Sequence, residues 1–169
     1  MIFSTLYLIL AISITSSAPD VATHHASRTN VPVVNFEELQ EYLSEFGDKT
    51  LVINYWATWC VPCVKELPYF EEVTAKYDAE EVEVILVSLD FSDQIASTLV
   101  PFIEKHHLRS NVILLDDPDA NSWIDKVSPQ WSGAIPATVI KRGDKEAFYE
   151  QSFHAFEELQ QIIKPFLKS

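Results

Sequence analysis

Hydrophobic positions along the chain alternate between helix-like and strand-like groups. Apolar residues spaced three or four apart predict amphipathic helices, whereas short apolar runs rich in β-branched residues predict buried strands. Helices are expected at residues 36–46, 60–77, 95–107 and 156–166, with one more short helix near Trp123 in the irregular segment 116–132. Strands are expected at residues 51–55, 82–89 and 112–115, and a hairpin pairs residues 137–141 with 146–149 around Arg142-Gly143-Asp144.

The order of these elements predicts one α/β domain over residues 32–169. Strands that alternate with helices become parallel neighbours in one sheet, and the closing hairpin adds antiparallel strands. We therefore expect a central mixed β-sheet flanked by helices. The chain has 169 residues, of which 47% are hydrophobic, and this is enough to fill the core of a single domain.

Local signals mark where the predicted helices begin, end and bend. Asn35 and Glu38 have the spacing of a capping box at the start of the first helix. Gly47 suits its end. Pro68 lies inside the second helix, where it removes a backbone hydrogen bond and should kink the axis. Pro101 must start, kink or break the third helix.

The first 18 residues differ in composition from the rest of the chain. The run from Ile2 to Ile14 is almost wholly apolar and carries no charge, and small residues follow it up to Ala18. It is shorter than the roughly 20 residues of a membrane-spanning helix. The pattern predicts a signal peptide over residues 1–18 and a flexible linker over residues 19–31. We expect export to a periplasmic or extracellular location, and an uncleaved membrane anchor is the alternative.

The formal net charge of −13 restricts the classes of partner. A nucleic-acid surface needs clustered Lys and Arg, so we expect no nucleic-acid partner. An anionic membrane surface is disfavoured for the same reason. An excess of acidic side chains is typical of a surface that keeps an exported protein soluble.

The chain contains two cysteines, Cys60 and Cys63, within the sequence WATWCVPC at residues 56–63. A disulfide across so short a loop gives little loop-closure stabilisation, which favours a reactive pair over a structural one. The pair lies after a predicted buried strand and at the start of a helix, where thiols ionise more easily. We expect Cys60 to be the exposed nucleophile, and Cys63, one turn further on, to resolve the mixed disulfide.

Glu66 lies three residues after Cys63 on the same predicted helix. Helical side chains lean toward the N-terminus, so its carboxyl group can point at Cys63. A half-buried carboxyl with a raised pKa would act there as the base that deprotonates the resolving thiol. The alternative is an ordinary first-turn acid that complements the helix dipole.

Trp123 and Trp131 fall in the irregular segment near the predicted active face. They could form an apolar rim for a protein substrate. We favour the other interpretation, in which these large aromatic side chains pack the segment onto the domain.

Three features together resemble the thioredoxin superfamily, and specifically its secreted TlpA/ResA-like branch. They are the WATWCVPC sequence, Pro68 five residues after Cys63, and the sequence GAIPAT at residues 133–138. The resemblance covers residues 33–169 and implies a thioredoxin-like fold.

The resemblance also implies roles for individual residues. Pro136 matches the cis-proline beside the cysteines, and Ile135 would offer backbone hydrogen bonds to the substrate chain. Trp59 matches the aromatic residue that shields the site, and Glu66 matches the acid near the thiols. Asn54 stands where thioredoxin has a buried Asp, and because an amide cannot accept a proton at neutral pH, this substitution favours Glu66 as the base.

The expected function is that of a thiol–disulfide oxidoreductase of the protein-disulfide reductase type. Its partners would be protein thiols and disulfides and a membrane electron donor, and we expect a monomer without cofactor or metal. A copper-binding module is one alternative, since two thiolates and a histidine can hold Cu(I). A thiol peroxidase is disfavoured because the chain has no third cysteine. A non-catalytic interaction domain is disfavoured by the intact cysteine pair.

Overall fold

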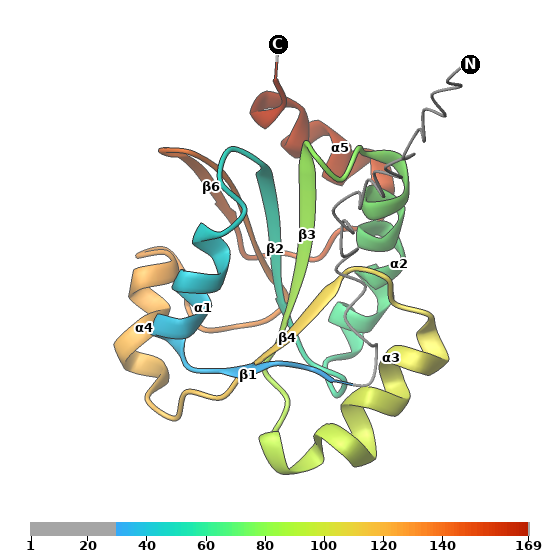
Figure 1. The fold of residues 1–169 in the computed structure, drawn as a ribbon, viewed down its shortest axis with the longest axis vertical. Helices are drawn as coiled ribbons and strands as arrows, with labels where there is room; N and C mark the ends of the chain where they lie inside the picture. Colours follow the sequence, from blue (N-terminus) through green and yellow to red (C-terminus); the bar gives the residue numbers. More distant parts are fainter. Residues whose placement is uncertain (1–29, 169) are drawn as a thin grey trace, which may run out of the picture.

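A six-stranded sheet in the order β1-β4-β3-β2-β5-β6 forms the centre of the molecule (Figure 1). The computed structural model describes residues 30–168, so the predicted signal peptide and residues 19–29 of the predicted linker lie outside the described residues. The strands are β1 (Val33–Val34), β2 (Thr50–Trp56), β3 (Val82–Ser88), β4 (Asn111–Leu115), β5 (Ala137–Arg142) and β6 (Lys145–Tyr149). The first four strands run parallel, whereas β5 is antiparallel to both β2 and β6. The predicted mixed sheet and hairpin are confirmed.

Helices cover both faces of this sheet. They are α1 (Phe36–Ser44), α2 (Val61–Lys76), α3 (Val100–His106), α4 (Ala120–Val127) and α5 (Phe156–Ile163). One apolar cluster joins α1 and α4 to one face of the sheet, and another joins α2, α3 and α5 to the opposite face (Figure 1). The short helix expected near Trp123 is α4. Within residues 30–168, no helix has both the length and the apolar character that crossing a membrane requires.

The central strand β2 shows how the sequence pattern builds these two layers. All seven of its residues are buried, as expected for a strand covered on both faces. Ile53 and Tyr55 pack in the cluster with α1 and α4, whereas Val52 and Trp56 pack in the cluster with α2, α3 and α5. Asn54 lies on the same face of β2 as Val52 and Trp56, so its side-chain amide points toward α2, the helix that carries the cysteines.

The expected helix at residues 95–107 is divided in the structure. A 3-10 turn (Ser92–Gln94) and a π-helical turn (Ile95–Leu99) come first, and α3 begins only at Val100. Pro101 lies in the first turn of α3, and helical backbone precedes it, because the Val100 N–H donates to the Ile95 carbonyl in the π-helical turn. Of the three outcomes expected for this proline, the structure shows the start of an α-helix, which follows directly on the π-helical turn.

The short edge strand β1 was not predicted from the sequence. Val33 and Val34 pair with Leu114 and Leu115 of β4, and the carbonyl of Pro32 accepts a hydrogen bond from Leu114 (2.9 Å). A run of two residues carries no readable period. Its conformation is therefore set by pairing with β4 and not by a local pattern.

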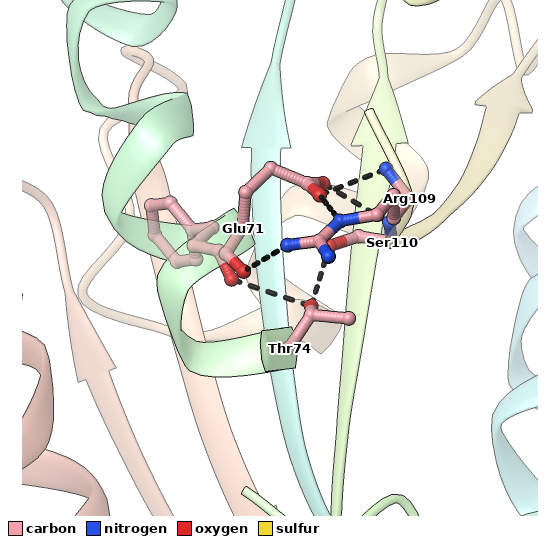
Figure 2. A network of polar contacts seen from close by, with 5 residues as sticks. Glu71, Thr74, Arg109 and Ser110 are labelled. Carbon is pink, nitrogen blue, oxygen red and sulfur yellow. Dashed lines mark hydrogen bonds and ion pairs between the residues drawn. The ribbon is translucent and has the colours of Figure 1, made fainter. Parts of the chain in front are cut away.

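The second half of α2 is tied to the chain that enters β4 (Figure 2). The Glu71 carboxylate accepts hydrogen bonds from the backbone N–H groups of Arg109 (2.8 Å) and Ser110 (3.0 Å). The hydroxyl groups of Thr74 and Ser110 lie 2.7 Å apart and share a hydrogen bond. Together these contacts hold the part of α2 that follows Pro68, toward the helix end farther from the cysteines.

Candidate active site

Cys60 and Cys63 form a disulfide bond at the start of α2. Cys60 is the N-cap residue of the helix, and its sulfur accepts a hydrogen bond from the backbone N–H of Cys63 (3.3 Å). Cys60 keeps 5% of its surface exposed, whereas Cys63 is fully buried. An incoming sulfur nucleophile can therefore reach Cys60 but not Cys63.

The same N-cap geometry explains why Cys60 would ionise readily once reduced. The free N–H groups of the first turn and the helix dipole both stabilise negative charge at this position. A hydrogen bond from the Cys63 N–H to the Cys60 sulfur favours the thiolate over the neutral thiol. The outer cysteine is thus the better nucleophile of the two.

The Ile135–Pro136 segment lies beside the outer sulfur. Its peptide bond is cis, the geometry that the family resemblance implies. The Ile135 carbonyl oxygen lies 3.7 Å from the Cys60 sulfur. The sheet register explains this approach, because Ala137 at the start of β5 pairs with Tyr55 near the end of β2. Antiparallel pairing thus brings the residues before β5 next to the residues that follow β2.

Two side-chain contacts hold the segment that carries Pro136. The Trp131 indole N–H donates to the Ala134 carbonyl (2.7 Å). The Glu150 carboxylate accepts hydrogen bonds from the hydroxyl and the backbone N–H of Ser132. These hydrogen bonds lower the pKa of the exposed Glu150 carboxyl. The segment is therefore fixed from the chain after α4 on one side and from the end of β6 on the other.

Glu66 is fully buried on α2, one turn beyond Cys63. Its carboxyl oxygens accept hydrogen bonds from the side-chain amide of Asn54 (2.9 Å) and the backbone N–H of Phe153 (2.7 Å). Burial raises the pKa of Glu66 to about 7, although both hydrogen bonds act in the opposite direction. Among the described residues its hydrogen-bond partners are these two groups and not a cysteine sulfur.

Asn54 links Glu66 to the next strand. Its amide nitrogen also donates to the hydroxyl of Thr138 on β5 (3.1 Å), and its carbonyl oxygen has no partner among the described residues. Rotation of the amide by 180° would present that oxygen to a protonated Glu66. Asn54 can therefore accommodate either protonation state of the acid.

Asp90 fastens the loop that carries Cys60 to the end of β3. Its carboxylate accepts hydrogen bonds from the backbone N–H (3.0 Å) and the hydroxyl (2.5 Å) of Thr58. It also accepts one from the hydroxyl of Ser88 (2.7 Å). Reasoning from the sequence assigned no role to these residues, because Thr58 and Asp90 lie 32 residues apart along the chain.

We predict that Asp90→Ala destabilises the domain by about 2 kcal/mol, because the partly buried N–H and hydroxyl of Thr58 lose their acceptor. Urea denaturation of the oxidised protein measures this loss. Asp93→Ala is the matched control, since Asp93 is an exposed acid on the turn that follows. Equal midpoints for the two variants would show that Asp90 does not hold the loop.

The remaining aromatic residues of the site divide into exposed and packed ones. Trp59, which the resemblance assigns to shielding, is 59% exposed. Trp123 and Trp131 are buried, and both contact the ring of Tyr55 on β2. The favoured interpretation of these two tryptophans as packing residues is confirmed, so they do not form the rim of the site.

Few side chains in the described part of the chain are placed to bind a metal ion. Among residues 30–168, no three His, Cys, Asp or Glu side chains come together as a metal-binding group. The two sulfurs, once reduced, would be the thiolate ligands available at the helix start.

A match to a family sequence model shows the family to which this chain is related. The sequence model of the AhpC/TSA family matches residues 13–143, which is more than half of the sequence. The chain belongs to the AhpC/TSA family. This match spans β1 to β5 and therefore includes both cysteines and the Ile135–Pro136 segment.

Within this family, the chain is similar to curated proteins named thiol-disulfide oxidoreductase ResA. The relative from Oceanobacillus iheyensis is 38% identical over 66 residues, which are 39% of this chain and 33% of the relative. A relative from Bacillus cereus is 33% identical over 85 residues, or 50% of this chain and 47% of the relative. The matched region spans less than half the length of these relatives. The resemblance to ResA is confirmed over this region.

Solved structures show the same fold. A DsbF homologue from Corynebacterium diphtheriae superposes with a TM-score of 0.59 at 21% identity, covering 73% of this chain and 75% of the other. A secreted thiol-disulfide isomerase from Corynebacterium glutamicum gives a TM-score of 0.57 at 21% identity, covering 73% and 74%. At this level of identity the likeness establishes the thioredoxin-like fold.

Proposed function

We propose that this chain is an exported thiol–disulfide oxidoreductase that reduces or exchanges disulfides of other proteins. The observation that carries the proposal is the Cys60–Cys63 disulfide at the start of α2, with only Cys60 accessible and Ile135 beside it. The names of the curated ResA relatives support this activity.

The reaction follows from the order of the two sulfurs. The Cys60 thiolate attacks one sulfur of a substrate disulfide, so that a mixed disulfide forms and the other substrate sulfur leaves as a thiolate. The Cys63 thiolate then attacks the Cys60 sulfur and releases the second substrate thiol. Two electrons pass to the substrate, and the protein is left with the Cys60–Cys63 disulfide seen in the structure. A donor must return two electrons before the next cycle, and we propose a membrane protein for this role.

Ile135 and Trp59 would position the substrate for this attack. The main chain of Ile135, held next to the Cys60 sulfur, can hydrogen-bond to an extended substrate segment while Pro136 maintains the turn. Trp59 directly precedes Cys60 in the sequence, and its side chain is exposed.

Glu66 would accept the proton of the resolving thiol. A buried carboxyl with a pKa of about 7 exists in both protonation states near neutral pH, which suits a proton acceptor. Because the Cys63 side chain is fully buried, its proton has no direct route to solvent, and an internal acceptor one helical turn away meets that need.

Export would place this chemistry outside the cytoplasm. The predicted signal peptide at residues 1–18, with its apolar run, supports export. Solved structures of the same fold also include proteins described as secreted. A reductant in an oxidising compartment depends on a continuous supply of electrons, which is why a membrane donor belongs to the proposal.

The reduction potential of the cysteine pair tests the proposal directly. The protein is equilibrated in a series of thiol–disulfide buffers, and the fraction of reduced Cys60 and Cys63 is fixed by alkylation. We expect a value at or below about −250 mV, in the range of a reductant. A value near about −120 mV would mark an oxidant and overturn the proposed direction of electron flow. A pair that does not exchange with these buffers at all would overturn the activity itself.

A further inference from the structure

We infer that Glu150 is a positioning residue for protein substrates, which acts through Ser132 to fix the main chain of Ile135 beside the Cys60 sulfur. The inference rests on the proposed function and adds to it a residue from outside the cysteine motif. Glu150 directly follows β6, so no feature of that motif points to it.

The segment that precedes β5 has no regular secondary structure. Residues 128–136 form neither helix nor strand, so their course depends on individual hydrogen bonds and not on a ladder. Gly133 has a φ of +90°, and a Cβ placed there would lie 3.2 Å from Cδ1 of Ile124 on α4. The backbone conformation and the neighbouring helix both disfavour a side chain at this position. The turn is therefore closely defined by its surroundings.

The sheet register brings Glu150 to this segment. Tyr149, the last residue of β6, pairs with Thr138 of β5, and Glu150 is the next residue. Because the two strands are antiparallel, Glu150 lies level with the residues that lead into β5. Its carboxylate accepts hydrogen bonds from the backbone N–H (3.1 Å) and from the hydroxyl of Ser132. Both carboxylate oxygens thus hold the same residue.

Ser132 passes this constraint to the next peptide units. Its hydroxyl oxygen accepts a hydrogen bond from the Ala134 N–H (3.4 Å), while the Trp131 indole donates to the Ala134 carbonyl (2.7 Å). Because a peptide unit is planar, the bond to this carbonyl also fixes the direction of the Ile135 N–H. The Ile135 carbonyl lies 3.7 Å from the Cys60 sulfur. A hydrogen-bonded path therefore joins the carboxylate after β6 to the main chain that the proposed function assigns to substrate binding.

The exposure of Glu150 separates this role from one in core packing. Trp131, which holds the other side of the segment, is buried among aromatic rings, whereas the Glu150 side chain is exposed. Its loss removes the hydrogen bonds to Ser132 without opening a cavity. We expect the effect in reactions with extended substrates, which pair with the Ile135 main chain, and not with small disulfides, which reach only the sulfur.

The test measures two substrates, a disulfide-bonded peptide and hydroxyethyl disulfide, with the reduced protein in stopped flow. In Glu150→Ala, the ratio of the peptide rate constant to that of hydroxyethyl disulfide should fall about fivefold, the scale of one lost hydrogen bond. Glu150→Gln should recover most of the ratio, because its amide can accept from the Ser132 N–H and donate to the hydroxyl. Ser132→Ala should lower the ratio about as much as Glu150→Ala. The double variant should fall no further, since both changes break the same path.

Glu146→Ala is the matched control. It removes an equal charge from β6, but Glu146 pairs with Lys141, toward the end of β5 farther from Ile135. Its ratio should equal that of the wild type. An unchanged ratio in Glu150→Ala, an equal loss in Glu146→Ala, or a ratio in Glu150→Gln as low as in Glu150→Ala would overturn the positioning role while leaving the activity standing. If the wild-type protein reduces neither the peptide nor hydroxyethyl disulfide, the proposed function fails, and the inference that rests on it fails too.

Discussion

Cys60→Ser is expected to lower the rate of disulfide reduction by on the order of 10⁴-fold or more, the scale of loss when a covalent nucleophile is removed. A serine hydroxyl does not ionise near neutral pH, so the helix start has no thiolate to stabilise. Cys63 cannot substitute for it, because the structure buries that residue completely. The measurement is thiol release from a disulfide-bonded peptide under conditions of excess reductant.

Cys63→Ser is the partner experiment that separates the two roles. This variant keeps Cys60, the cysteine that retains some accessible surface, but cannot resolve the mixed disulfide, so a covalent adduct with the peptide should accumulate. Intact-protein mass spectrometry detects the adduct as an added peptide mass. Accumulation in Cys60→Ser and not in Cys63→Ser would reverse the assignment of attacking and resolving sulfurs.

Glu66→Gln is expected to remove a pH-dependent contribution of about 3 kcal/mol to the free energy of unfolding. The pKa of Glu66 rises from an ordinary 4.5 to about 7 on folding, and a shift of that size corresponds to this free energy. A raised pKa means that the folded protein binds the proton more tightly than the unfolded chain does. The contribution is therefore complete below pH 4.5, is lost progressively between pH 4.5 and 7, and does not change further above pH 7.

Urea denaturation of the oxidised protein between pH 4.5 and 8 measures this effect as the difference between wild type and variant. Glu37→Gln serves as the control, since Glu37 is an exposed acid in the first turn of α1. The free energy of unfolding of Glu66→Gln relative to wild type should rise through this window, whereas that of Glu37→Gln should stay nearly flat. Parallel curves for all three proteins would show that the buried carboxyl does not titrate as proposed.

The same variant tests the role of Glu66 in the reaction. If the carboxylate accepts the Cys63 proton, Glu66→Gln should slow resolution of the mixed disulfide and remove its pH dependence near pH 7. Single-turnover kinetics isolate this step from the first attack. An unchanged resolution rate would favour the alternative, an acid that only complements the helix dipole.

The layers of the fold could be predicted from the sequence because they depend on local periodicity. The apolar residues of α2 and α5 repeat at helix spacing and β2 is a short apolar run, so the burial of each segment could be inferred from that segment alone. The two residues of β1 and the π-helical turn before α3 are too short to carry a period. The conformation of β1 is set by pairing with β4, which is a tertiary effect, and the π-helical turn directly precedes the first turn of α3, which contains Pro101.

The candidate site likewise contains residues that local spacing could bring together and contacts that the sequence could not predict. Cys60, Cys63 and Glu66 lie within two turns of one helix, so spacing sufficed to bring them together. The contact of Asp90 with Thr58 joins separate elements, and no local pattern marks it. The full burial of Glu66 could not be predicted from the sequence either, because it depends on the chain around Phe153, which packs over the helix.

The redox site joins two parts of the chain that lie 75 residues apart, Cys60 and Ile135. Because ribosomes build proteins from the amino terminus, both cysteines are made well before the strand that completes their surroundings. Until β5 inserts beside β2, the Cys60 sulfur lacks the Ile135 carbonyl that lies 3.7 Å from it in the folded domain. A growing chain therefore carries both cysteines before the segment that completes their surroundings has been synthesised and folded.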